Sequence, residues 1–213
     1  SQCAERRPAA RQPWRGRCAS RRTPGSPSVN ASRPATLTEP ARSVPVHGEF
    51  DVVVLGGGPA GIAAAASAAR SGTSTLLVER YGFLGGMGTA AGVTNFCGLH
   101  ANVHGESRRV VHGVVDELLA RIERLDGLNA PHRVLGRIDA QAYDMSAYKC
   151  AADELLAAAG ARVLHHALGA GIAQRDGGDL DALFVETKSG RRAIRARAFV
   201  DCSGDGDLAH RAG

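Results

Sequence analysis

The 213-residue sequence lacks any apolar run that approaches the ~20 residues needed to span a membrane. It also lacks the apolar segment of a secretory signal peptide. The five cysteines are odd in number and widely spaced, and no two of them form a C-x-x-C motif. These absences offer no disulfide framework and lead us to expect a cytoplasmic protein with reduced thiols and no membrane partner.

An excess of positive charge is absent from most of the chain, although the formal net charge is +5. Residues 1–48 hold nine arginines and two acidic residues, whereas residues 49–213 hold 17 basic and 19 acidic residues. The basic character therefore belongs to the N-terminal segment. The remainder gives no electrostatic reason to expect a nucleic-acid partner.

Residues 1–48 also contain seven of the nine prolines and few apolar residues. Such a segment cannot bury enough surface to offset the entropy of ordering, so we predict a disordered tail over 1–48. Three explanations fit it: an organelle transit peptide, a basic arm that binds nucleic acid, or an extension without function. The prolines would break the amphipathic helix of a transit peptide, and composition alone favours the extension.

From residue 49 onward, the patterns predict one α/β domain over 49–213. Phe50–Leu55 and Thr73–Val78 have the composition of buried parallel strands, and Pro59–Ser71 between them predicts a helix, which together make a βαβ unit. The further predicted elements are, in order, a glycine-rich loop over 82–98, helices over 110–125 and 144–159, a parallel strand over 162–166, an antiparallel meander over 168–196, and a buried strand over 198–202 followed by the start of a helix.

A glycine motif lies between the first strand and the first helix. Gly56, Gly58 and Gly61 have the spacing G-x-G-x-x-G: the first allows a tight turn, the second a close approach to a pyrophosphate, and the third close packing of helix on strand. Glu79 ends the second strand, where its carboxylate can accept hydrogen bonds from ribose hydroxyls. This combination predicts a dinucleotide site.

Two later motifs bear on which dinucleotide is bound. They are LGGM at 84–87 and SGDGD at 203–207, the latter following a buried strand. Together with GGGPAG at 56–61 and Glu79-Arg80, they resemble the FAD-dependent oxidoreductases of the glutathione-reductase-like flavoprotein superfamily, over Phe50–Gly213. The resemblance implies a Rossmann-like FAD/NAD(P)-binding domain, with a parallel sheet flanked by helices and an antiparallel β-meander.

The resemblance also implies FAD as the cofactor and assigns residues to its parts. The segment after the third strand, 166–169, would pass the adenine. The remaining residues so implied are Gly56, Gly58, Pro59, Ala60 and Gly61 at the pyrophosphate, Glu79 and Arg80 at the adenosine, Gly85, Gly86 and Met87 toward the pyrophosphate and flavin, and Gly204 and Asp205 at the phosphates and ribityl chain.

The function that the resemblance implies is hydride or electron transfer through FAD, on a small-molecule substrate that the sequence does not identify. Members of the family are longer, and the sequence begins with Ser1, so we expect a piece of a larger enzyme that ends before its substrate-binding region. No catalytic residue is assigned. The alternatives are a nucleotide-binding module or inactive fragment, and an NAD-dependent dehydrogenase, which would leave the LGGM and SGDGD motifs without a role.

The spacing C-x2-H-x3-H of Cys97, His100 and His104 is compatible with a metal site, but a zinc site needs a fourth ligand and His112 is the sole candidate nearby. We therefore predict no metal and interpret these residues as part of a loop that borders the flavin. Cys97 is a candidate nucleophile or, more simply, a small buried residue.

Overall fold

The computed structural model describes residues 39–213, so the first 38 residues of the predicted disordered tail lie outside it. The elements run in the order β1 (Val46–Leu55), α1 (Pro59–Arg70), β2 (Thr75–Val78), the 3-10 helix η1 (Gly86–Gly88), β3 (Asn95–Cys97), β4 (His100–Val103), β5 (Glu106–Arg109), α2 (Val114–Arg124), β6 (His132–Val134), β7 (Ile138–Ala142), α3 (Met145–Ala159), β8 (Arg162–Leu164), β9 (Leu168–Gln174), β10 (Leu180–Thr187), β11 (Gly190–Asp201) and α4 (Asp207–Ala212).

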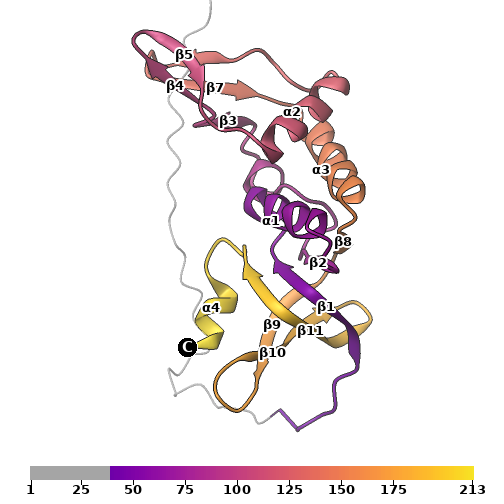
Figure 1. Ribbon diagram of the computed structural model, residues 1–213. Helices are drawn as coiled ribbons and strands as arrows, with labels where there is room; N and C mark the ends of the chain where they lie inside the picture. Colours follow the sequence, from indigo (N-terminus) through magenta and orange to yellow (C-terminus); the bar gives the residue numbers. More distant parts are fainter. Residues whose placement is uncertain (1–38) are drawn as a thin grey trace, which may run out of the picture. The chain divides into compact units, whose positions relative to one another are not determined.

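A six-stranded sheet organises the domain, with the order β8-β2-β1-β11-β10-β9 (Figure 1). β8, β2, β1 and β11 pair in parallel, and β10 pairs antiparallel with both β11 and β9. The expected α/β architecture, with a parallel sheet and an antiparallel meander, is confirmed. β1 lies between β2 and β11, so the first strand of the domain pairs directly with the last.

The separate final strand that the sequence predicts over 198–202 is not present as such. It is the second half of β11, which runs without a break from Gly190 to Asp201. The first half of β11 pairs with β10 up to Arg195, and β1 already pairs with β11 from Ala193 onward. Because the two ladders overlap, no residue between the halves is left without a neighbouring strand, and the strand continues.

The folded domain also begins earlier than residue 49. β1 starts at Val46, and the backbone N–H of Ala193 donates to the carbonyl of Pro45 at 3.0 Å. Arg42 forms an ion pair with Glu186 on β10 at 3.7 Å. β1 therefore begins before the predicted boundary at 48/49, because Val46 and Gly48 pair with β11 despite the proline-rich composition around them.

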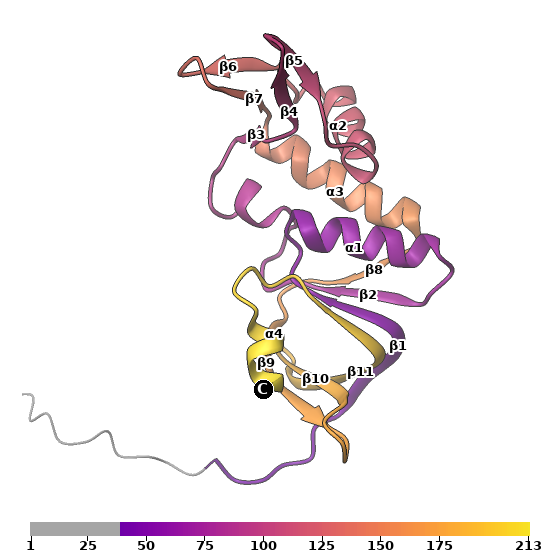
Figure 2. The same cartoon turned by 60° about the vertical axis from the view of Figure 1, so that its left-hand side comes forward.

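Helices and strands cover opposite faces of the parallel part of the sheet. α1 and α3 lie over one face (Figure 2), where Val54 and Leu77 pack among their alanines and leucines. On the other face Val53 and Leu76 pack against the meander and Leu208 of α4. This alternation of neighbouring residues is the period of two expected of a strand that is buried on both sides.

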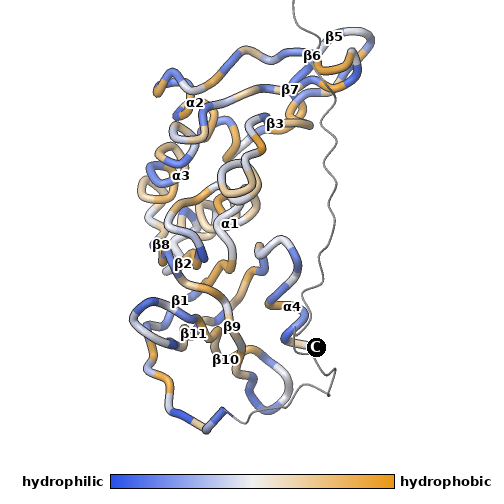
Figure 3. The backbone as a smooth tube through the Cα atoms, turned by 180° about the vertical axis from the view of Figure 1, so that it is seen from behind, coloured by the Kyte–Doolittle hydropathy of each residue, from blue (hydrophilic) through white to orange (hydrophobic). Residues whose placement is uncertain are grey.

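The segment between β2 and α3 holds structure that the sequence did not predict. The glycine-rich loop contains η1 and β3, and the chain then forms the hairpin β4-β5 and the small sheet β3-β7-β6. α2 starts at Val114 rather than at Val110. Gly113 adopts a φ of +90°, which is not helical, and the N–H of Val110 donates to the carbonyl of Leu99. In Figure 3 α2 alternates between hydrophilic and hydrophobic residues, as expected of a helix with one packed face.

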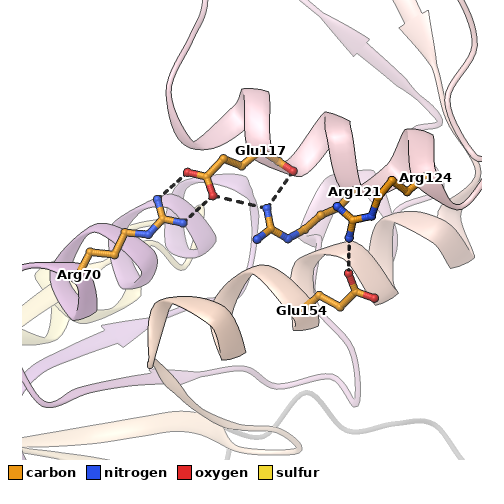
Figure 4. A network of polar contacts seen from close by, with 5 residues as sticks. All are labelled: Arg70, Glu117, Arg121, Arg124 and Glu154. Atoms are coloured by element: carbon orange, nitrogen blue, oxygen red, sulfur yellow. Dashed lines mark hydrogen bonds and ion pairs between the residues drawn. The ribbon is translucent and has the colours of Figure 1, made fainter.

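Ion pairs on the surface connect α2 to α1 and α3 (Figure 4). Arg70 of α1 donates two hydrogen bonds to the Glu117 carboxylate, at 2.7 and 2.8 Å, and these lower the pKa of Glu117. Arg121 contacts the same carboxylate at 3.4 Å, and Arg124 reaches Glu154 of α3 at 3.0 Å. Because these side chains are partly exposed, the ion pairs contribute little to the stability of the fold. Within residues 39–213, no helix has both the length and the apolar composition needed to cross a bilayer.

The early start of β1 makes a testable difference between two shortened chains. A chain that begins at residue 49 loses the pairing of Val46 and Gly48 with β11 and the hydrogen bond from Ala193 to Pro45. We expect it to be less stable than a chain that begins at residue 39 by about 1–3 kcal/mol, the contribution of a few backbone hydrogen bonds. Urea denaturation measures this difference, and equal midpoints would place the boundary where the sequence predicted it.

Candidate functional site

A cavity of about 450 Å³ opens at the carboxyl ends of β1, β2 and β11, beside the first turn of α1. This is where open α/β sheets bind ligands, in the crevice beyond the ends of parallel strands. The walls come from six short segments: residues 55–60, 78–81, 86–87, 90–91, 167–169 and 202–207 without residue 206.

The glycine loop is shaped by close backbone contacts. Gly56 has a φ of +104°, and a Cβ on it would overlap the carbonyl of Cys202. A Cβ on Gly61 would overlap the carbonyl oxygen of Gly56, so only glycine lets α1 lie this close to β1. Gly58 has a φ of −73°, and a Cβ on it would have space, because its nearest neighbour would be the Cα of Gly86 at 3.9 Å. Gly56 and Gly58 line the cavity, whereas Gly61 does not line it and packs against Gly56 instead.

The N-terminus of α1 faces the cavity without a side-chain cap. Gly58 is the N-cap residue and Pro59 the first helical residue, and the first turn contains no acidic side chain. Pro59 and Ala60 both line the cavity. Unpaired N–H groups and the positive end of the helix dipole favour a negatively charged ligand at this point. A pyrophosphate fits this chemistry.

Glu79 is only 5% exposed, and its carboxylate holds two backbone segments together. One oxygen accepts the N–H of Gly57 at 2.6 Å, and the other accepts the N–H of Tyr81 at 2.8 Å. A carboxylate has about four acceptor positions, so two remain for ligand hydroxyls. Glu79 and Arg80 both line the cavity, and the Arg80 guanidinium lies 4.8 Å from the centre of the Tyr81 ring.

The LGGM turn contributes to the cavity in part. Gly86 and Met87 line it, and the Met87 side chain is exposed. Gly85 does not line it: its N–H donates to the carbonyl of Gly57 at 2.8 Å, and a Cβ on it would overlap Thr89. Gly85 therefore joins the two glycine-rich turns to each other.

Asp201 was missed as a site residue, although it lies two residues before the SGDGD motif. One carboxylate oxygen accepts the hydroxyl of Ser203 at 2.6 Å and its N–H at 3.0 Å, and the other accepts the N–H groups of Leu208 and Ala209 at 3.0 and 2.9 Å. Burial raises the pKa of Asp201, but these hydrogen bonds outweigh burial, and the net pKa is lowered.

The Asp201 hydrogen bonds shape the turn that reaches the cavity. Gly204, with a φ of +94°, and Asp205 both line it. The sequence signal for Asp201 was its place at the end of a predicted strand and two residues before SGDGD, since a carboxylate that ends a strand can accept the N–H groups of the helix that follows.

The other candidate residues lie apart from this cavity. Among residues 39–213, no three His, Cys, Asp or Glu side chains come together as a metal site. Cys97 and His100 belong to β3 and β4, and Cys97 is exposed rather than buried. In the segment expected near an adenine, residues 167–169 line the cavity, whereas the His166 ring lies against Gly82.

Comparison with known proteins agrees with this geometry. A family model described as "FAD dependent oxidoreductase" matches residues 51–213. A dihydrolipoyl dehydrogenase from Trypanosoma brucei brucei is 51% identical over 45 residues, which are 21% of this chain and 9% of that protein.

Solved structures share the fold at low sequence identity. A geranylgeranyl bacteriochlorophyll reductase-like protein from Thermoplasma acidophilum matches with a TM-score of 0.55 and 20% identity, over 78% of this chain and 42% of that one. The aromatic hydroxylase CabE from angucycline biosynthesis matches with a TM-score of 0.53 and 18% identity, over 77% and 33%. The chain thus spans less than half the length of these proteins.

The contact between Gly61 and Gly56 predicts a strong effect of one methyl group. Gly61→Ala places a Cβ on the Gly56 carbonyl and must separate α1 from β1, so we expect a loss of more than about 3 kcal/mol, the upper end for overpacking. Gly58→Ala is the matched control, and its Cβ has space; we expect a change below about 1 kcal/mol. Urea denaturation of both variants measures this, and similar stabilities would contradict the close contact.

The lowered pKa of Asp201 predicts a pH-dependent difference between the wild-type chain and Asp201→Asn. A carboxyl group with a lowered folded-state pKa stabilises the fold above its unfolded pKa of about 3.9, and this contribution is lost as the pH falls through the folded pKa. We expect Asp201→Asn to be less stable by about 1–3 kcal/mol at pH 7. The two chains should converge below pH ~4 in denaturation curves, whereas a constant difference would exclude the ionised carboxylate as its source.

Proposed function

Since the chain belongs to the FAD-dependent oxidoreductase family, we propose that it forms the FAD-binding part of an enzyme that oxidises or reduces a small-molecule substrate. FAD is the cofactor of this family. The single observation that carries the proposal is the convergence of three turns on one cavity, at an uncapped helix N-terminus: the glycine loop, the LGGM turn and the turn after β11.

The residues of the cavity fit the successive parts of FAD. The pyrophosphate would lie against Gly56, Gly58, Pro59 and Ala60. No large side chain covers the backbone there, and the helix dipole favours anions. The two remaining acceptor positions of Glu79 suit the hydroxyls of the adenosine ribose.

The other cavity residues suit the two ends of the molecule. Arg80 would lie at the adenine, Gly86 and Met87 would lie on the flavin side, and Gly204 and Asp205 would meet the phosphates and the ribityl hydroxyls. When bound, FAD supplies hydride or electron transfer, and the chain supplies binding and orientation. An NAD-dependent dehydrogenase is disfavoured, because it would leave the LGGM turn and the turn after β11 without a ligand to contact.

We also propose a cytoplasmic location and no nucleic-acid partner. Cys97, Cys150 and Cys202 are free thiols, as in a reducing compartment. Of the arginines on β11, Arg191, Arg195 and Arg197 each pair with an acidic side chain, at 3.0, 3.7 and 3.4 Å. Charges that are paired in this way do not form a basic patch for phosphates.

Titration with FAD and, separately, with NAD tests the proposal. We expect saturable binding of FAD and no binding of NAD. The change in flavin absorbance and the quenching of flavin fluorescence measure the binding of FAD. Gly58→Leu should abolish FAD binding, because its side chain would occupy the pyrophosphate position, while circular dichroism shows an intact fold.

Ser67→Leu is the matched control for this titration, because it adds the same side chain to an exposed position of α1 away from the cavity. It should bind FAD as the wild-type chain does. Undiminished binding of FAD by Gly58→Leu would show that the pyrophosphate does not bind at this loop. Preferential binding of NAD would overturn the assignment of FAD as the cofactor.

A further inference from the structure

A stack of cations and aromatic rings leads from the wall of the cofactor cavity to α3. The Arg80 guanidinium lies 4.8 Å from the centre of the Tyr81 ring, and this ring stacks on Phe83, with the centroids 5.7 Å apart and 9° between the planes. The Lys149 Nζ atom of α3 lies 3.9 Å from the centre of the Phe83 ring. Arg80 and Tyr81 line the cavity, whereas Phe83 and Lys149 do not. The stack thus connects the cavity wall to a helix that does not reach the cavity.

The two cations of this stack have rings as partners in place of acids. Within residues 39–213, neither the Arg80 nor the Lys149 side chain forms an ion pair or a hydrogen bond. The face of a ring attracts a cation, and it orients a guanidinium without occupying the N–H donors. A carboxylate in the same place would occupy those donors and cancel the charge. Arg80 is therefore oriented and still able to contact a ligand.

The backbone beside Arg80 is fixed independently of the stack. The Glu79 carboxylate accepts the N–H of Tyr81 at 2.8 Å, and the carbonyl of Tyr81 accepts the N–H of His166 at 3.1 Å. Gly82 lies so close to the His166 ring that a Cβ on it would overlap the ring. Because the turn is held in this way, the stack affects the position of the Arg80 side chain and not the path of the chain.

We propose that Tyr81, Phe83 and Lys149 are positioning residues, which hold the Arg80 guanidinium in the cavity wall as a stacking surface for the adenine ring. The adenine at this place rests on the proposed function. A guanidinium is planar and stacks on aromatic faces, including those of nucleotide bases. A long side chain that is oriented before the ligand arrives loses less conformational freedom on binding, so the stack strengthens the binding of the nucleotide.

Substitutions at the far end of the stack test this role, because Phe83 and Lys149 do not line the cavity. We expect Phe83→Leu and Lys149→Met each to weaken the binding of FAD by about threefold, the effect of one lost contact between a cation and a ring at an exposed site. Phe83→Tyr and Lys149→Arg keep the ring and the charge, and they should keep the affinity of the wild-type chain. Quenching of flavin fluorescence measures these affinities, and circular dichroism checks the fold of each variant.

Arg162→Met is the matched control for Lys149→Met. The Arg162 guanidinium lies 5.3 Å from the centre of the Phe50 ring, and neither residue lines the cavity. This variant also removes a cation from a ring, and it should bind FAD as the wild-type chain does. An equal loss of affinity in Arg162→Met and Lys149→Met would overturn the proposal.

A double-mutant cycle separates positioning from a general loss of structure. Arg80→Gln removes the group that the stack holds, and we expect it to weaken FAD binding by about fivefold. In the Arg80→Gln chain, Phe83→Leu and Lys149→Met should then have no further effect, because they act through Arg80. A loss of the same size with and without Arg80 would overturn the positioning role.

Isothermal titration with ADP distinguishes failure of the stack from failure of the proposed function. ADP carries the adenine, a ribose and two phosphates but no flavin, so Phe83→Leu should weaken it as much as it weakens FAD. Unchanged affinities for both nucleotides in Phe83→Leu and Lys149→Met would overturn the stack and leave FAD binding standing. Binding of ADP that depends on Phe83, in a chain that does not bind FAD, would overturn the proposed function and leave the stack standing.

Discussion

The domain depends on the close approach of three backbone segments where β1 ends and α1 begins. Gly61 of α1 contacts the carbonyl of Gly56, and Gly56 in turn contacts the backbone at Cys202, just beyond β11. A side chain at Gly61 would separate α1 from the end of β1, and one at Gly56 would separate that end from the backbone beyond β11. Because the three segments touch, the N-terminus of α1, the end of β2 and the turn after β11 surround one cavity.

Two buried or half-buried carboxylates hold the turns around that cavity in the same way. Glu79 at the end of β2 accepts N–H groups from Gly57 and Tyr81, and Asp201 at the end of β11 accepts them from Ser203 and the first turn of α4. Each carboxylate pairs the N–H groups of a turn whose glycines have no side chains to pack. The turns around the cavity are therefore fixed by hydrogen bonds to carboxylates, and turns that are already fixed need little rearrangement when a ligand binds.

α1 separates two cavities of different chemistry. On one side its uncapped N-terminus favours the phosphates of FAD, and on the other Ile62 and Ala63 contribute to an apolar cavity with an aromatic wall. Pro59 and Met87 belong to both.

The sequence by itself determined the elements whose signals are local. The βαβ unit, the helix over 144–159 that α3 confirms, and many of the residues that line the cavity follow from periodicity, glycine spacing and the family motifs. These signals are readable because each depends on a few neighbouring residues: a turn needs glycine at one position, and a helix needs a cap at its end.

Only the tertiary structure decided features that depend on residues far apart in the chain. β11 is one strand because β10 and β1 pair with overlapping parts of it, and β1 begins at Val46 because β11 extends that far. Gly61 and Gly85 do not line the cavity, because the Gly56 carbonyl lies beside the first and the Thr89 side chain beside the second. The second cavity likewise arises where three helices and a loop meet, and such an arrangement has no signature in the order of the residues.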